Sequence, residues 1–376
     1  MNRFLLPYQQ KTGDSMPQLR FINIGLRVLA VCAFVASSYP VWAADEKPQP
    51  DERLQRLLKR FPAADKNKDG ILTRDEARAY RQQMQKRQGR PVNSVKPTHA
   101  DVKYGDHARN VLDFYQAKSD QPTPLVVYIH GGGFVGGSKR VNPGFLQQCL
   151  DAGISVAAIH YRFIDGEKVL LPEPQRDGAR AVQFLRSKSK EWNIDPKRVA
   201  CFGGSAGAGI SMWIAFHDDL AKPDSDDPIE RESTRIQAVG TFGGQSTYDP
   251  IKIKALVGGR AWEHPSIFKA YGVDTAEEAL HPTPEQQKRY DESSAIMHLT
   301  KDDPPLYMVY SEADGPLPAN ARPGQGIHHP NFGRDLVKKM DELEIENVFI
   351  YTPEAKGRNP QREMLEFFQK QFAKVK

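Results

Sequence analysis

Two glycine-rich motifs contain residue types that could carry out chemistry. Residues 203–207 read Gly-Gly-Ser-Ala-Gly, a G-x-S-x-G pattern centred on Ser205, and residues 130–134 read His-Gly-Gly-Gly-Phe. In the first motif the glycines allow a sharp turn that lifts the serine hydroxyl above the edge of a sheet as a nucleophile. In the second, glycine amides can donate hydrogen bonds to an oxyanion, with the Ala206 amide as a second arm. Together the motifs predict a site for nucleophilic attack on a carbonyl carbon.

Alternating strand-like and helix-like segments from about residue 100 onward would position these motifs. Apolar runs, several of them continuous as in strands covered on both faces, predict strands at 111–117, 125–130, 155–160, 198–203, 238–243, 305–310 and 347–352. Helical spacing predicts helices at 142–152, 173–192, 205–217, 330–343 and 360–375. This alternation indicates an open α/β fold with a mostly parallel sheet and helices on both faces. Both motifs directly follow strands, at the carboxyl ends where such sheets bind ligands.

On these motifs, and on His160-Tyr161-Arg162 and Asn193-Ile194-Asp195-Pro196, the chain resembles the α/β-hydrolase fold over about residues 101–372. Within that fold it resembles serine esterases with an HGGG loop, of the hormone-sensitive-lipase-like and carbohydrate-esterase-like branch. The resemblance implies an enzyme that hydrolyses carboxylic esters and needs no cofactor for catalysis.

The resemblance also implies roles for individual residues. Ser205 would be the nucleophile, and Gly131, Gly132 and Ala206 would form the oxyanion hole. Asp314, which follows the strand at 305–310, is nominated as the acid of a Ser-acid-His triad, with Glu312 as a weaker candidate.

The histidine departs from the family pattern, because the loop 351–360 after the last strand contains none. Beyond Asp314 the chain has only His328 and His329, at the end of an insertion at 316–327. The favoured hypothesis is that this insertion folds back and brings His328 or His329 to Ser205, since triads are defined by spatial role and not by chain position. In the alternative, both histidines cap the helix that begins near residue 330. The protein would then be a catalytically degenerate, calcium-stabilised binding protein.

Residues 65–76 (DKNKDGILTRDE) match the EF-hand calcium loop at every specified position. The flanking segments 52–61 and 74–88 have helical spacing, and Gly70 permits the sharp turn of the loop. No second loop accompanies this one, so we expect a structural or weak calcium site. The expected oxygen ligands are Asp65, Asn67, Asp69, the Ile71 carbonyl, Thr73 and Glu76.

Residues 1–43 have the features of a secretory signal peptide: basic residues, a short apolar run at 22–36, and Val41-Trp42-Ala43 before a charged segment. They predict export to the periplasm or the exterior, with no stable membrane span after cleavage. This leader carries a net +3 of the chain's +5, which leaves +2 and no case for a nucleic-acid partner. Outside the leader, Cys149 and Cys201 lie in apolar segments and are expected to be buried thiols.

The 376 residues are therefore divided into a signal peptide (1–43), an EF-hand helix-loop-helix (45–90), a linker (91–99) and a hydrolase domain (100–376) with a cap at about 247–293. With 39% hydrophobic and 26% charged residues, wholesale disorder is excluded. The expected partner is a small-molecule or carbohydrate ester bound beneath the cap. The cap aromatics Trp262, Phe268 and Tyr271 could stack on that substrate or form the core of the cap.

Overall fold

The computed structural model describes residues 52–73, 75–77, 79–80 and 95–375. The predicted signal peptide and residues 91–94 of the predicted linker lie outside this range. The chain divides into two units, residues 1–88 and 89–376, and each is described by itself. Among the described residues, no helix combines the length and the apolar character needed to cross a bilayer.

The larger unit is built on one sheet of eight strands in the order β1-β2-β4-β3-β5-β6-β7-β8. The β1/β2 and β2/β4 pairs are antiparallel, and every other pair is parallel. The strands are β1 (His99–Lys103), β2 (Val111–Tyr115), β3 (Thr123–Ile129), β4 (Ser155–Ile159), β5 (Ile194–Gly204), β6 (Ala238–Phe242), β7 (Leu306–Tyr310) and β8 (Asn347–Tyr351). The mostly parallel α/β-hydrolase sheet predicted from the sequence is thus confirmed, with β1 as an additional edge strand.

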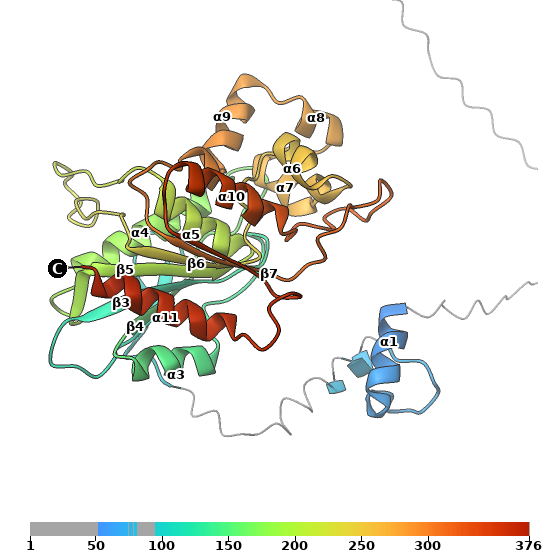
Figure 1. Ribbon diagram of the computed structural model, residues 1–376, viewed down its shortest axis with the longest axis horizontal. Coiled ribbons are helices and arrows are strands. Elements are labelled where there is room, and N and C mark those ends of the chain that lie inside the picture. Colours follow the sequence, from blue (N-terminus) through green and yellow to red (C-terminus); the bar gives the residue numbers. More distant parts are fainter. Residues whose placement is uncertain (1–51, 74, 78, 81–94, 376) are drawn as a thin grey trace, which may run out of the picture. The chain divides into compact units, whose positions relative to one another are not determined.

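Helices cover both faces of this sheet (Figure 1). On one face, α3 (Pro143–Asp151) and α11 (Pro360–Ala373) bury Phe145 and Phe368. On the other lie α4 (Glu173–Ser187), α5 (Ala206–Phe216) and α10 (Asn331–Glu342). The strands contribute to the cores on both faces because their side chains alternate. In β3, Val126 packs on the face covered by α3 and α11, and Leu125 and Val127 pack on the face covered by α4, α5 and α10. Cys149 and Cys201 are free, buried thiols, as expected.

The segment predicted as a cap folds into short helices above the second face (Figure 1). They are α6 (Pro250–Val257), η2 (Ala261–Glu263), α7 (Pro265–Tyr271), α8 (Ala276–Leu280) and α9 (Pro284–Ser293), followed by η3 (Ala295–Met297). Trp262 and Tyr271 are almost completely buried, and Phe268 packs against the same core. These aromatics therefore form the core of the cap.

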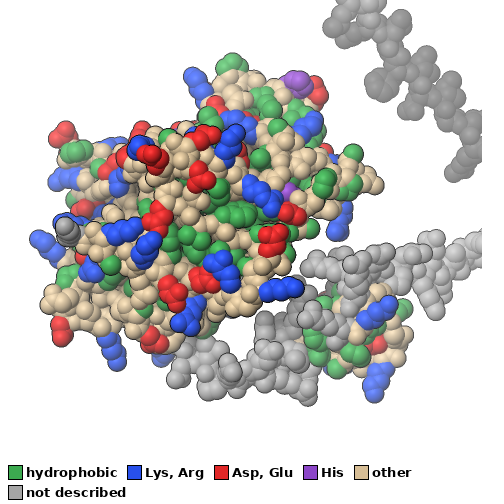
Figure 2. All heavy atoms as spheres, viewed as in Figure 1, with side chains coloured by type: hydrophobic (Ala, Val, Ile, Leu, Met, Phe, Trp, Pro, Cys, Tyr) green, Lys and Arg blue, Asp and Glu red, His purple; other side chains and the backbone are tan. Residues whose placement is uncertain are grey.

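The surface of the larger unit shows no concentration of one charge on the face seen in Figure 2, where acidic and basic side chains are intermixed. Several of them pair at close range, as Lys370 and Lys374 do with Glu346. The two lysines lower the pKa of Glu346 to about 2.

The described part of the smaller unit is a helix, an acidic loop and helical residues at 75–77 and 79–80. Helix α1 (Glu52–Arg60) leads through η1 (Pro62–Ala64) into residues 65–76. Leu72 is buried and packs with Ala64 and Ala77, and Leu57 and Phe61 cover this small core. The buried Leu72 anchors the loop, while most of the neighbouring polar residues are exposed.

Candidate active site

Ser205 occupies a strained turn between β5 and α5. Its backbone has φ 54° and ψ −125°, and its amide donates to the Phe242 carbonyl at 2.9 Å. The flanking glycines are required by close packing, because a Cβ on Gly203 would lie 2.4 Å from the Gly207 carbonyl oxygen. A Cβ on Gly207 would lie 2.1 Å from the Ile129 carbonyl oxygen. This is the geometry of a nucleophile elbow, in which the serine side chain is held above the sheet edge.

His328 supplies the imidazole that the loop after β8 lacks. Its Nε2 lies 2.8 Å from Ser205 Oγ, and its Nδ1 lies 3.3 Å from Glu312 Oε1. The His328 backbone amide donates to the second oxygen of the same carboxylate at 3.3 Å. Burial alone would raise the pKa of Glu312, but the hydrogen bonds and charge of His328 outweigh it and lower this pKa. An ionised Glu312 can therefore orient the imidazole and stabilise its protonated form.

Asp314 and His329, two residues nominated from the sequence, do not join this constellation. Asp314 forms an ion pair with Arg334 of α10, with 2.6 Å between Oδ2 and the guanidinium. His329 is buried, and its Nδ1 accepts from the Asn331 amide at the start of α10. The structure thus corrects the preference for Asp314, because Arg334 holds this carboxylate while Glu312 meets His328. Of the two histidines considered as helix caps, His329 is the one whose ring accepts from the first amide of α10, and Pro330 occupies the cap position.

Gln245, which the sequence reasoning missed, positions the backbone next to His328. Its Nε2 donates to the Ile327 carbonyl at 2.7 Å and to the Gly243 carbonyl at 3.2 Å. Its Oε1 accepts from the Tyr248 hydroxyl at 3.2 Å. Because every polar atom of this buried amide has a partner, Gln245 has one orientation. Its place just after β6, at the edge where β5 and β7 also end, is the signal that could have identified it.

The HGGG loop lies directly beside the nucleophile. A Cβ on Gly131 would lie 2.6 Å from the Gly204 carbonyl oxygen and 3.3 Å from Ser205 Cβ. Gly132 has φ 114° and lines the same cavity as Ala206 and Ser205. Ala206 is the first residue of α5, where amides lack intrahelical acceptors. Gly131, Gly132 and Ala206, named from the sequence as an oxyanion hole, therefore all lie around Ser205.

A polar cluster behind the loop fixes its position. Arg109 Nη2 lies 2.9 Å from His160 Nδ1, and the Tyr161 hydroxyl donates to the His130 carbonyl at 2.9 Å. Burial, together with the neighbouring Arg109 charge, lowers the pKa of His160 to about 4. Burial also lowers the pKa of His130. Both imidazoles are neutral near pH 7, so Arg109 carries the positive charge of this cluster.

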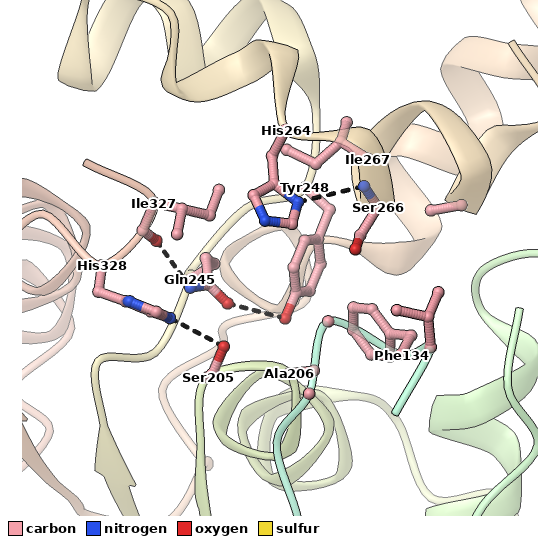
Figure 3. Close-up of a pocket in the computed structure, with 14 residues that line it drawn as sticks. Phe134, Ser205, Ala206, Gln245, Tyr248, His264, Ser266, Ile267, Ile327 and His328 are labelled. Carbon is pink, nitrogen blue, oxygen red and sulfur yellow. Dashed lines mark hydrogen bonds between the residues drawn. The ribbon is translucent and has the colours of Figure 1, made fainter. Parts of the chain in front are cut away.

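These residues open onto a cavity of about 330 Å³ (Figure 3). Ser205 and His328 lie at one side, while His264 and Ser266 from the cap face them across the cavity (Figure 3). Burial, followed by the effect of His328, lowers the pKa of His264. The apolar part of the wall is formed by Phe134, Val135, Tyr248, Ile267, Ala270 and Ile327. The site thus combines a serine-histidine pair with an apolar chamber of small size.

Two of the carboxylates named from the acidic loop, Asp65 and Glu76, accept hydrogen bonds from other residues of the same loop. Glu76 accepts from the amides of Lys66 and Asn67 with one oxygen, and from the Thr73 hydroxyl at 2.7 Å with the other. The hydrogen bonds from Thr73 are the largest cause that lowers the pKa of Glu76. Asp65 accepts from the Gly70 amide at 2.9 Å. Hydrogen bonds to Asp65 and Glu76 thus close the loop on itself.

Comparison with known families identifies the larger unit. Residues 112–322, more than half of the chain, match the family model BD-FAE. The chain belongs to the BD-FAE family. The match begins in β2, includes the HGGG loop, the elbow and Glu312, and ends just before His328.

Curated relatives carry ester-hydrolase names. A "probable isoprenylcysteine alpha-carbonyl methylesterase" of Arabidopsis thaliana is 27% identical over 58% of this chain and 44% of its own length. A "probable carboxylic ester hydrolase" of Mycobacterium tuberculosis is 26% identical over 60% of this chain and 50% of its own length. The chain thus spans about half the length of these relatives.

Among solved structures, the truncated form of a carbohydrate esterase from gut microbiota superimposes with a TM-score of 0.58 at 19% identity. The match covers 75% of this chain and 98% of that one. At 19% identity this likeness supports the α/β-hydrolase fold of the present chain and nothing finer.

Proposed function

We propose that this protein is a serine-dependent carboxylic ester hydrolase. The observation that carries the proposal is the contact of 2.8 Å between His328 Nε2 and Ser205 Oγ, with Glu312 at the other imidazole nitrogen. A serine hydroxyl becomes an effective nucleophile only beside a general base. The ester-hydrolase names of the family relatives support the same activity.

The residues define a two-step reaction. His328 Nε2 takes the proton of Ser205 Oγ as this oxygen bonds to the ester carbonyl carbon, and the carbonyl oxygen becomes an oxyanion facing the amides of Gly131, Gly132 and Ala206. His328 returns the proton to the alkoxy leaving group as the carbon–oxygen bond breaks, and an acyl-Ser205 remains. His328 then deprotonates a water molecule that attacks the acyl carbon, and Ser205 leaves with the proton.

The cavity points to esters with a small acyl group as substrates. Phe134, Tyr248, Ile267 and Ala270 form an apolar wall suited to an acyl chain, within a total volume of about 330 Å³. His264 and Ser266 add polar groups that can contact an alcohol such as a sugar. A carbohydrate or other small-molecule ester is therefore the substrate class that we infer.

The test uses a fluorophosphonate probe and a panel of p-nitrophenyl esters from acetate to octanoate. We expect labelling at Ser205, turnover that falls with acyl length, and loss of both in Ser205→Ala. Absence of labelling together with absence of turnover would favour the non-catalytic binding protein instead. That alternative has less support, since His328 Nε2 lies 2.8 Å from Ser205 Oγ, within reach for a general base.

We further propose that the protein is exported and that residues 65–76 bind calcium. Export rests on the features of residues 1–43, which lie outside the described structure. Calcium would be held by side-chain oxygens of Asp65, Asn67, Asp69, Thr73 and Glu76 and by the Ile71 carbonyl. The ion would brace the loop of the smaller unit, and no catalytic step depends on it. Fractionation of cells that express the full chain tests export, and retention of an uncleaved protein in the cytoplasm would reject it.

A further inference from the structure

A cluster of two histidines and a glutamate lies at the end of α5 opposite to Ser205. His217 directly follows α5, Glu292 belongs to α9, and His298 directly follows η3. One ligand atom from each residue lies within 4.8 Å of the others. The three side chains come from separate segments: the C-terminal end of α5, helix α9, and the residue after η3. The proposed ester chemistry uses none of them.

Hydrogen bonds to backbone carbonyls determine which nitrogen of each imidazole is available. His217 Nδ1 lies 3.0 Å from the Asp218 carbonyl oxygen, and His298 Nε2 lies 2.8 Å from the Glu292 carbonyl oxygen. A carbonyl oxygen only accepts, so each of these nitrogens carries the proton. The lone pairs therefore reside on His217 Nε2 and His298 Nδ1. Metal-binding histidines are oriented by the same kind of N–H donation to a backbone carbonyl.

One available nitrogen lies against the Glu292 carboxylate, and the second imidazole lies beside the first. His217 Nε2 lies 3.4 Å from Glu292 Oε1, and the imidazoles of His217 and His298 are 4.5 Å apart between ring centroids. A neutral imidazole nitrogen and a carboxylate oxygen are both acceptors, so their approach is unfavourable unless a proton or a metal ion lies between them. Trp213 packs on the His217 ring at 4.3 Å and its indole donates to the Glu292 carbonyl, which holds the cluster in place.

We propose that His217 Nε2, His298 Nδ1 and the Glu292 carboxylate bind a divalent transition-metal ion of the zinc class. Two imidazoles and one carboxylate form a donor set suited to zinc, whereas calcium and magnesium select oxygen ligands. The Arg176 guanidinium lies 3.9 Å from Glu292 Oε1 and would compete with a metal ion for this carboxylate. Among the described residues, no other Lys or Arg forms an ion pair with Glu292. The metal ion would join the end of α5 to α9 and η3, and thus tie the cap to the sheet-covering layer.

The test titrates zinc chloride, and separately cobalt chloride, into the full chain after removal of metals with EDTA. The protein carries no polyhistidine tag, and excess calcium chloride is present to compete for residues 65–76. We expect one zinc ion per chain and, with cobalt, visible absorption bands of a low-coordinate site. Glu292→Gln should weaken zinc binding by more than roughly tenfold, since even losing a residue that only orients a metal ligand costs about 10- to 100-fold. This substitution keeps the backbone carbonyl that Trp213 and His298 contact.

Two further variants make the test specific. His217→Gln should weaken zinc binding similarly, while His281→Gln, at an exposed histidine after α8, should bind as the wild type does. His328→Ala should also retain zinc binding, which separates this site from the proposed ester-hydrolase site. Circular dichroism in EDTA checks that each variant is folded. The proposal is overturned if the wild type binds no zinc, or if folded Glu292→Gln and His217→Gln proteins bind zinc as tightly as the wild type.

Discussion

His328 Nε2 lies 2.8 Å from Ser205 Oγ although the two residues are 123 positions apart in the chain. The contact is made from the loop between β7 and α10, so the imidazole enters the site beside Glu312, its own acid partner. The order serine, acid, histidine is retained along the chain. Compared with the family pattern, in which the histidine follows the last strand, only the loop that carries the histidine differs.

If this pair acts as a unit, Ser205→Ala and His328→Ala should each lower kcat for p-nitrophenyl acetate by a factor of about 10⁴ or more. The double variant should lose no further activity, because either residue alone is ineffective. Steady-state kinetics on the three proteins measure this. Additive losses in the double variant would show that the two residues act independently.

Substitutions of the two candidate acids, Glu312 and Asp314, should have very different effects on kcat. Glu312→Gln should lower kcat by roughly 10³- to 10⁴-fold, since the amide cannot stabilise a protonated His328. Asp314→Asn should leave kcat close to that of the wild type and lower the free energy of unfolding by only about 1 kcal/mol or less, because its partner Arg334 is half-exposed. Kinetics and urea unfolding of both variants decide the point. The reverse ranking of kcat would restore Asp314 as the acid.

Gln245→Ala should reduce kcat by about 10- to 100-fold, because loss of its bond to the Ile327 carbonyl lets His328 shift by a fraction of an ångström or more. KM should change by a smaller factor than kcat, since Gln245 lines the cavity but its bond to Ile327 acts on His328. Thermal unfolding, followed in parallel, separates this effect from general destabilisation, and Gln287→Ala on α9 is a matched control. An unchanged kcat would remove Gln245 from the positioning role.

Calcium should bind to the chain with a Kd of about 10⁻⁴ to 10⁻³ M, in the range of single extracellular sites. Asp65→Ala and Glu76→Gln should each abolish the heat of binding in calorimetry, because each removes a carboxylate from the proposed ion shell. Asp75→Ala is the matched control, since Asp75 is an exposed acidic neighbour that lies outside the ligand positions. Binding by Asp65→Ala as tight as that of the wild type would contradict the assignment.

The pKa of His160, about 4 in the folded protein against an ordinary value of 6.5, makes stability depend on pH. Between these values the unfolded chain binds more protons than the folded one, so the free energy of unfolding should fall as the pH drops from 6.5 to 4. We expect His160 to account for about 1–2 kcal/mol of this loss, less than the full shift because the ring is partly solvated.

His160→Asn offers the comparison, since its side-chain oxygen can still accept from Arg109 but does not titrate. Urea unfolding at several pH values should show a smaller loss of stability in this variant, whereas His281→Asn should behave as the wild type does. Equal slopes in all three proteins would exclude His160 as the cause.

The sequence was sufficient for the elements with strong local signals. The continuous apolar strands and the paired glycine motifs place Ser205 and the HGGG loop, because their conformations depend on nearby residues. β1 was missed because its sequence, HADVK, is polar and only partly buried at the sheet edge. The choice between Glu312 and Asp314 could not be made locally, since it depends on Arg334, 20 residues further along the chain. Gln245 was missed for the same reason, because Ile327, the partner that links it to His328, lies in the loop before α10.

The loop between β8 and α11 contains residues 352–359 and, in this protein, contributes no reacting group. The middle of this loop is largely exposed. Helix α11 then begins at Pro360, with Asn359 as its N-cap. In a hydrolase whose catalytic histidine lies in this loop, residues inserted into the loop would displace the imidazole from the serine. Because most of this loop is exposed, we expect it to accept an inserted domain or a reporter peptide while the Ser205–His328 pair keeps its geometry.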